Sequence, residues 1–204
     1  MKSVARILYP ILRWCPGALG LLLRQKIYPS FLAFCGKGVV FGRFVDLQNP
    51  SAIHIGDNAV ISNRCRIVAG TDGEREYPVF IDEDVFIGIG TTVKVCKGSL
   101  RLKRGCNIGS ACLLTAHGVT ELGVCVLMAA FCTVGEGLSP GSFVVEGHII
   151  IEEDVWLGAR CAVQNTSYIG KGSIIGAHAK VVGEIPAFAI VTGDPALLKR
   201  YREK

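Results

Sequence analysis

Four histidines are the residues of this 204-residue chain best suited to acid–base chemistry at neutral pH: His54, His117, His148 and His178. A histidine can take the proton of an attacking hydroxyl group, because its side chain titrates near neutrality. The histidines are 63, 31 and 30 residues apart, no H-x4-H pair occurs, and no Cys/His pair has the spacing of zinc ligands. The sequence therefore predicts no metal site and makes the histidines candidates for proton transfer.

Composition limits the class of protein further. Half of the residues are hydrophobic and 19% are charged, which excludes a disordered chain. The net charge is +5, but the basic residues form no stripe, so no nucleic-acid partner is expected. The chain has nine cysteines, an odd number, and no C-x-x-C pair occurs among them. They are expected to be reduced, small apolar residues of a cytoplasmic protein.

A repeat of six residues predicts the fold and therefore the positions of the histidines in it. Aliphatic residues recur at every sixth position in runs of three between Ile55 and Val134, and then without a break from Ile151 to Val181. A period of six fits neither a helix of 3.6 residues per turn nor a flat strand of period two. It predicts an all-β solenoid in which three short strands and three turns make one triangular coil. Gly, Asn or Asp directly after the aliphatic is expected to supply the turn conformation, and small residues four positions after it to point inward.

The interruptions of the repeat all fall at one corner of the triangle. They place two long loops, about 69–78 and 135–148, on the same edge of the solenoid. Insertions at one edge of a solenoid usually build its binding surface. His117 follows the third aliphatic residue of its coil and His148 ends the second loop, so both are expected to point outward at this corner. His117 is the first candidate for a general base and His148 the second, whereas His54 lies away from the loops.

Three segments resemble the hexapeptide-repeat acyltransferases, in the branch that O-acetylates sugars of capsule and lipopolysaccharide. Residues 149–201 contain Asp-Val-Trp-Leu-Gly, Ile-Pro and Gly-Asp-Pro-Ala in the order of that branch, and residues 38–62 and 83–114 are also similar to it. The resemblance implies a left-handed parallel β-helix, a homotrimer, and transfer of an acetyl or other acyl group from CoA to a sugar or glycan precursor. It also implies a CoA slot between neighbouring solenoids, for which the candidate residues are Gly158, Ala159, Ala177 and His178. The phosphate-binding lysine of the family is replaced here by Val182-Gly183, and Lys180 and Lys199 are expected to compensate for its charge.

The sequence departs from this family in the loop that usually carries the catalytic base. The matching positions hold Leu138 and Ser139, neither of which titrates near neutrality, and Glu136 is the nearest carboxylate. A base must then come from elsewhere on the insertion corner, which favours His117 or His148. The alternative is a non-catalytic β-helix with a degenerate site, serving as a scaffold or binding CoA weakly.

The two ends of the chain differ from the repeat. Residues 1–37 are apolar, but their longest charge-free stretch, 14–23, is about half of the ~20 residues that a membrane span needs. They are expected to form a helical cap on the open end of the solenoid, with peripheral membrane contact as the alternative. The β-helix is expected over 38–185, followed by an extension, 186–204, that contains a short C-terminal helix.

Overall fold

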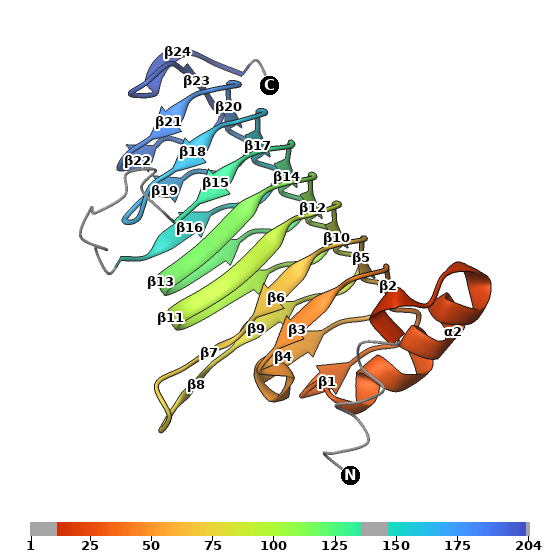
Figure 1. The fold of residues 1–204 in the computed structure, drawn as a ribbon. Helices are drawn as coiled ribbons and strands as arrows, with labels where there is room; N and C mark the ends of the chain where they lie inside the picture. Colours follow the sequence, from red (N-terminus) through yellow and green to blue (C-terminus); the bar gives the residue numbers. More distant parts are fainter. Residues whose placement is uncertain (1–11, 136–146, 203–204) are drawn as a thin grey trace.

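The six-residue repeat forms a stack of parallel coils. The computed structural model describes residues 12–135 and 147–202. The aliphatic residues pair from one coil to the next in the predicted register: Ile61 lies opposite Ile87, and Ile87 opposite Ile108. All eighteen are at most 2% exposed and together form the core. The fold is a left-handed parallel β-helix of hexapeptide repeats (Figure 1), so the predicted fold class is confirmed.

Each coil contributes one strand to each of three faces, which we number in the order that the chain visits them. The first face contains β1 (Phe34–Cys35), β4 (Ile53–Ile55), β9 (Val79–Ile81), β16 (Ile149–Ile151), β19 (Tyr168–Ile169) and β22 (Glu184–Ile185). The second face contains β2 (Val40–Phe41), β5 (Val60–Ile61), β10 (Phe86–Ile87), β12 (Asn107–Ile108), β14 (Leu127–Met128), β17 (Trp156–Leu157), β20 (Ile174–Ile175) and β23 (Ala189–Thr192). The third face contains β3 (Asp46–Gln48), β6 (Arg66–Val68), β15 (Thr133–Val134), β18 (Ala162–Val163) and β21 (Lys180–Val181).

Two long strands join the third face to the first at the corner that carries the insertions. They are β11 (Thr92–Leu102) and β13 (Leu113–Leu122), which pair in parallel along their lengths. In the coil before them, the chain leaves this corner as an antiparallel hairpin made of β7 (Gly70–Thr71) and β8 (Glu76–Tyr77). The hairpin projects from the stack on the same side as the start of β16 (Figure 1). We call this edge of the solenoid the insertion corner.

The other two corners are tight turns with a regular backbone. The residue three positions after the aliphatic has a positive φ, as at Asn58, Arg64 and Asp84. This differs from the expectation, which placed the turn conformation directly after the aliphatic. A glycine directly after the aliphatic residue, such as Gly88, allows the coils to stack closely instead. A Cβ on Gly88 would lie 2.6 Å from the carbonyl carbon of Gly109 in the next coil.

The expectation for the residue four positions after the aliphatic is confirmed. Cys65, Cys112, Cys132 and Cys161 occupy this position and are buried at the corner between the second and third faces. The Cys112 thiol donates to the carbonyl oxygen of Ala129 in the next coil (3.1 Å). Burial raises the pKa of the Cys65 thiol to about 11. These cysteines are therefore unreactive structural residues, and all nine cysteines are free thiols.

The predicted N-terminal cap is present. Helix α2 (Gly17–Ile27) and the short helix η1 (Tyr28–Ser30) lie at the N-terminal end of the stack (Figure 1), and η2 (Pro50–Ala52) precedes β4. The parallel strands extend from β1 to β23, a few residues beyond both expected limits of the β-helix, 38 and 185.

The predicted C-terminal helix is wrong. The chain instead forms β24 (Leu197–Tyr201), which pairs antiparallel with β23. Without it, the second face would end in a row of unpaired N–H and C=O groups, and an exposed edge of this kind is costly. The open edge of the sheet therefore outweighs the helical preference of a Leu-Leu-Lys-Arg sequence.

Candidate functional site

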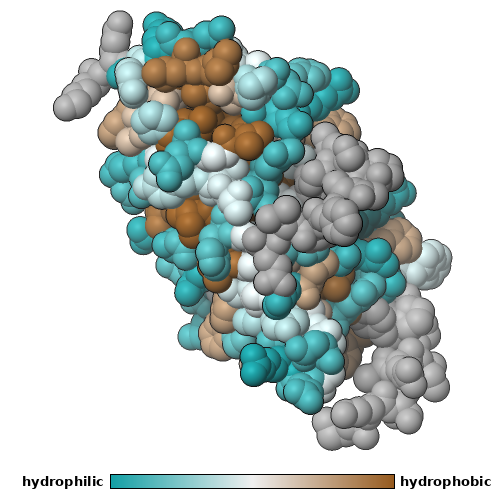
Figure 2. Space-filling model, turned by 90° about the vertical axis from the view of Figure 1, so that its left-hand side faces the viewer, coloured by the Kyte–Doolittle hydropathy of each residue, from teal (hydrophilic) through white to brown (hydrophobic). Residues whose placement is uncertain are grey.

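A cleft of about 740 Å³ lies at the insertion corner. Its walls come from different parts of the chain: the hairpin β7–β8, the bends of β11 and β13, and the start of β16. On this side of the molecule, hydrophilic side chains predominate and hydrophobic ones lie in separate patches (Figure 2). Both histidines that the sequence selected, His117 and His148, line this cleft.

Stacked glycines keep the corner open. Gly98 of β11 lies opposite Gly118 of β13, and Gly147 follows in the next coil. A Cβ on Gly98 would lie 2.3 Å from the carbonyl oxygen of Gly118, and a Cβ on Gly118 would lie 2.5 Å from that of Gly147. Three successive coils thus meet backbone to backbone, and the three glycines form part of the cleft wall.

The two histidines differ in their hydrogen bonds. The backbone N–H of Val119 donates to Nδ1 of His148 at 3.2 Å. Because Nδ1 accepts this bond, the neutral imidazole of His148 carries its proton on Nε2. Nε2 of His117, in contrast, is buried and has no hydrogen-bond partner among the described residues. A buried polar atom without a hydrogen-bond partner costs free energy. A bound hydroxyl group that donates a hydrogen bond to Nε2 of His117 would remove this cost.

Further polar groups surround the histidines. Lys97 lies opposite His117 in the pairing of β11 with β13. Ser167 is buried, lines the cleft, and has a hydroxyl oxygen without a partner among the described residues. Tyr168 and Glu184 line the cleft from the first face. Sequence reasoning missed Lys97 and Ser167, because neither carries a motif and only the coil register brings them to the cleft that the histidines line.

The hairpin adds Arg75 and Tyr77 to the cleft wall and is fixed by Asp72. The hydroxyl group of Tyr77 donates to Oδ2 of Asp72 (2.8 Å), which raises the pKa of Tyr77. The Asp72 carboxylate also accepts the backbone N–H groups of Arg75 (2.7 Å) and Glu74 (3.0 Å). These bonds, the one from Arg75 above all, lower the pKa of Asp72 to about 2.

The predicted CoA residues lie elsewhere. Gly158, Ala159, Ala177 and His178 occupy the corner between the second and third faces, where the N–H of His178 donates to the carbonyl oxygen of Ala159 (2.9 Å). The small side chains of Gly158, Ala159 and Ala177 suit the slot that the resemblance implies. None of the six predicted residues, these four with Lys180 on β21 and Lys199 on β24, lines the histidine cleft. Within one chain the third face separates the two groups.

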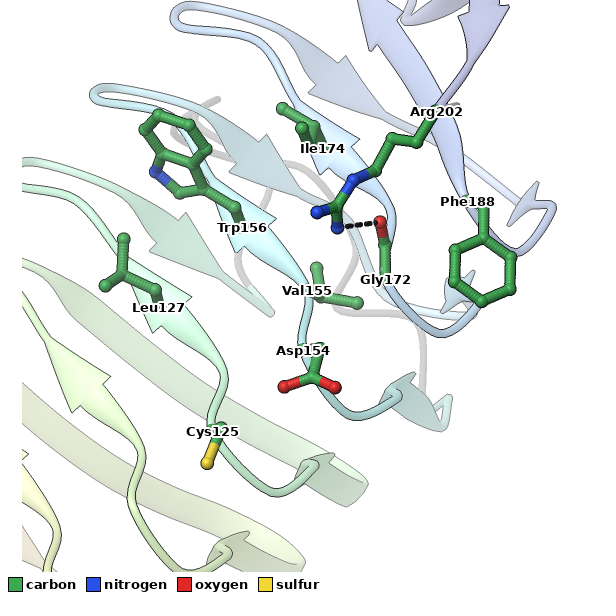
Figure 3. Close-up of a pocket in the computed structure, with 9 residues that line it drawn as sticks. All are labelled: Cys125, Leu127, Asp154, Val155, Trp156, Gly172, Ile174, Phe188 and Arg202. Carbon is green, nitrogen blue, oxygen red and sulfur yellow. Dashed lines mark hydrogen bonds between the residues drawn. The ribbon is translucent and has the colours of Figure 1, made fainter. Parts of the chain in front are cut away.

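A second cleft, of about 650 Å³, lies on the second face (Figure 3). Leu127, Trp156 and Ile174 project from neighbouring strands, and Arg202 donates to the carbonyl oxygen of Gly172 (2.8 Å) beside them. This apolar row is visible in the sequence as a second periodic pattern, which the sequence analysis missed. The residue directly before the aliphatic on the second strand of each coil is apolar in seven of eight coils: Val40, Val60, Phe86, Leu127, Trp156, Ile174 and Ile190.

The remaining candidates are His54 and three residues of the loop that usually carries the base. His54 lies on the first face, stacked on Phe80 with 4.8 Å between ring centroids. Glu136, Leu138 and Ser139 lie outside the described residues. Over 12–135 and 147–202 there is no group of three or more residues that could hold a metal ion. In the same part of the chain no helix is long and apolar enough to cross a membrane.

Comparisons with known proteins agree with this architecture. Residues 148–183 match the family model "Bacterial transferase hexapeptide (six repeats)". A protein named as a probable acetyltransferase from Mycobacterium tuberculosis is 29% identical over 128 residues, and the match covers 58% of this chain. It covers only 43% of that relative's length.

Two solved structures share the fold. The polysialic acid O-acetyltransferase OatWY has a TM-score of 0.63 at 16% identity, with 82% of this chain and 88% of the other covered. AntD, an N-acyltransferase from Bacillus cereus in complex with dTDP and 3-hydroxybutyryl-CoA, has a TM-score of 0.61 at 18% identity, with 88% of each chain covered. The chain is thus a hexapeptide-repeat β-helix, the architecture of these acyltransferases.

Proposed function

We propose that this protein is a CoA-dependent O-acyltransferase, in the first place an acetyltransferase, that acts on a sugar or glycan precursor. The observation that carries the proposal is Nε2 of His117, which is buried in a cleft at the insertion corner and has no hydrogen-bond partner within 12–135 and 147–202. The similarity to a named acetyltransferase and to the folds of OatWY and AntD supports the same class of reaction.

In the proposed reaction, His117 acts as the general base. Its Nε2 takes the proton of the acceptor hydroxyl, and the oxygen attacks the carbonyl carbon of the thioester. The carbon–sulfur bond then breaks, and the imidazolium of His117 returns the proton to the departing CoA thiolate. His148 is less suited to this role, because its Nδ1 already accepts the Val119 N–H and its Nε2 carries a proton. It would instead donate a hydrogen bond that orients the acceptor.

The proposed assembly is a homotrimer. The predicted CoA residues and the histidine cleft lie at different corners of one chain, so a neighbouring copy must bring the two together. The apolar row on the second face, which includes Leu127 and Trp156, offers a surface for such a contact. A mass near 22 kDa by light scattering at micromolar protein concentration would contradict the trimer. The cytoplasmic location stays a prediction from the free thiols.

The decisive experiment compares CoA release by the wild type and by His117→Ala. Acetyl-CoA is offered with a panel of sugars and nucleotide sugars, and CoA is separated by chromatography, because the exposed Cys125 would react with thiol reagents. Removing a general base typically costs 10²–10⁴-fold in rate, so His117→Ala should lose at least about a hundredfold in turnover. Its affinity for acetyl-CoA should stay within a few-fold of the wild type.

Two further variants make this result specific. His148→Ala should lose less turnover than His117→Ala, and the matched control His54→Ala, which lies outside the cleft, should keep full turnover. A larger loss in His148→Ala would transfer the role of base to His148. If no acceptor in the panel gives CoA release above hydrolysis, the non-catalytic alternative is favoured.

A further inference from the structure

The cap helix α2 is apolar on both of its sides. Its inner side carries Gly20, Leu23, Arg24 and Ile27 and packs on the first coil. The buried guanidinium group of Arg24 fixes the helix there. It donates to three carbonyl oxygens, those of Phe41 (2.9 Å), Cys15 (2.9 Å) and Leu12 (3.1 Å). One side of the helix is therefore fully used in closing the end of the solenoid.

The outer side of α2 faces solvent, although it is just as apolar. Leu19 and Leu22 are three residues apart on one helix face, 66% and 61% exposed, and Trp14, which precedes the helix, is 62% exposed. Among the described residues, these are three of the four most exposed large hydrophobic side chains. Single exposed hydrophobic residues are common, but three of them in one short stretch of the cap indicate an interaction surface. We call Trp14, Leu19 and Leu22 the cap patch.

The charge of the chain is concentrated at the same end. Residues 1–45 contain seven Lys or Arg and no Asp or Glu, whereas residues 46–204 contain 15 basic and 17 acidic residues, a net charge of −2. The whole positive balance of the protein therefore lies in the N-terminal 45 residues. Near the cap patch, Lys26 is exposed on α2, and Arg43 donates to the carbonyl oxygen of Trp14 (3.3 Å).

We propose that the cap patch docks on an anionic lipid surface. Trp14, Leu19 and Leu22 enter the interfacial layer, and the basic residues around them meet the lipid headgroups. Weak apolar insertion combined with basic residues is how peripheral proteins bind such membranes. Helix α2 has eleven residues, about 16 Å in length, so it lies in the interface and does not span the bilayer.

Charge also argues against a second copy of the chain as the partner of the cap patch. Two caps placed against each other would bring together two segments, residues 1–45 of each copy, that contain basic but no acidic residues, so a second copy of the chain is disfavoured. Docking through the cap points the solenoid away from the lipid. His117 lies in the fourth coil, about three coil spacings or roughly 14 Å from the first, which leaves the cleft in the aqueous layer above the headgroups.

The test uses the full chain and vesicles of defined composition. We expect the wild type to sediment with vesicles of phosphatidylglycerol and phosphatidylcholine but not with pure phosphatidylcholine, and to be released as salt rises from 0.1 to 0.5 M. These concentrations are roughly where screening of surface charge becomes strong. Leu19→Ser/Leu22→Ser should lower the partition coefficient at least about tenfold. The matched control is Leu197→Ser/Leu198→Ser, an exposed apolar pair at the opposite end of the solenoid, which should bind as the wild type does.

A second measurement locates the contact. In a Trp156→Phe background, Trp14 is the only tryptophan left, and brominated lipids should quench its fluorescence. Equal loss of binding in both serine variants, or equal binding to neutral vesicles, would overturn the proposal. So would a solution dimer that Leu19→Ser/Leu22→Ser dissociates, since a second copy would then cover the cap patch. None of these results depends on acyltransferase activity.

Discussion

The tight corners and the insertion corner of this solenoid solve the same geometric problem in opposite ways. At the tight corners the chain turns with one residue of positive φ, and that residue can be an arginine or an aspartate, as at Arg64 and Asp84. At the insertion corner the strands β11 and β13 run through the bend, and three glycines stack where the coils meet.

The difference separates stability from chemistry. The tight corners stack identical turns, so their side chains fill the core or face solvent in a fixed pattern. At the insertion corner the stacked positions are glycines, which have no side chain, and a cleft lies there. The polar side chains of His117, His148 and Ser167 line this cleft. Substitutions in the buried aliphatic columns should therefore mainly change stability, and those of the polar side chains around the cleft should mainly change function.

The largest predicted effect on stability is in the periodic part. Ile108→Ala removes a fully buried side chain from the column of aliphatic residues and should lower the free energy of unfolding by about 2–5 kcal/mol. Its control, Val119→Ala, lies at the insertion corner, where the side chain is 39% exposed, and should change it by less than about 1 kcal/mol. Urea unfolding at one protein concentration measures both. Similar losses in the two variants would contradict the comparison.

The same contrast explains what could be predicted from the sequence. The register of the aliphatic residues depends only on spacing, so the coils, the three faces and the corner of the insertions were all predicted. Both histidines of the cleft were found for the same reason, since their distance from the repeat fixed their corner.

What could not be predicted depends on contacts between coils or at chain ends. The partnership of Val119 with His148 joins two coils, and no local pattern encodes it. Ser167 became a cleft residue only because the coil stack places it beside the insertion corner. The C-terminal strand β24 was missed because it forms by pairing with β23 at the open edge of the second face, and that edge exists only once the whole stack has formed.

A smaller effect distinguishes the two uses of glycine. Gly118→Ala should lower the free energy of unfolding by about 1–3 kcal/mol, because its Cβ would lie 2.5 Å from the carbonyl oxygen of Gly147. Gly90→Asn, at a tight corner, should change it by less than about 1 kcal/mol. Although Gly90 has φ +72°, a Cβ there has no neighbour within 4 Å, and asparagine tolerates this conformation. Thermal unfolding of the two variants compares them, and a greater loss in Gly90→Asn would show that backbone conformation, not close stacking, limits both corners.

The smallest effect concerns the hairpin that walls the cleft. The folded-state pKa of Asp72 is lowered to about 2, while an unfolded aspartate titrates near 3.9. Because the folded value is the lower one, the stabilisation by the Asp72 hydrogen bonds is fully present above about pH 4 and is lost as the pH falls toward about 2. Hydrogen-exchange protection factors of the peptide that contains the amides of Glu74 and Arg75 should therefore be the same at pH 7 and pH 4.5, and should fall near pH 2.5. Asp72→Ala should lack this protection at every pH. If the wild type already loses protection between pH 6 and pH 5, a group other than Asp72 holds the hairpin against the insertion corner.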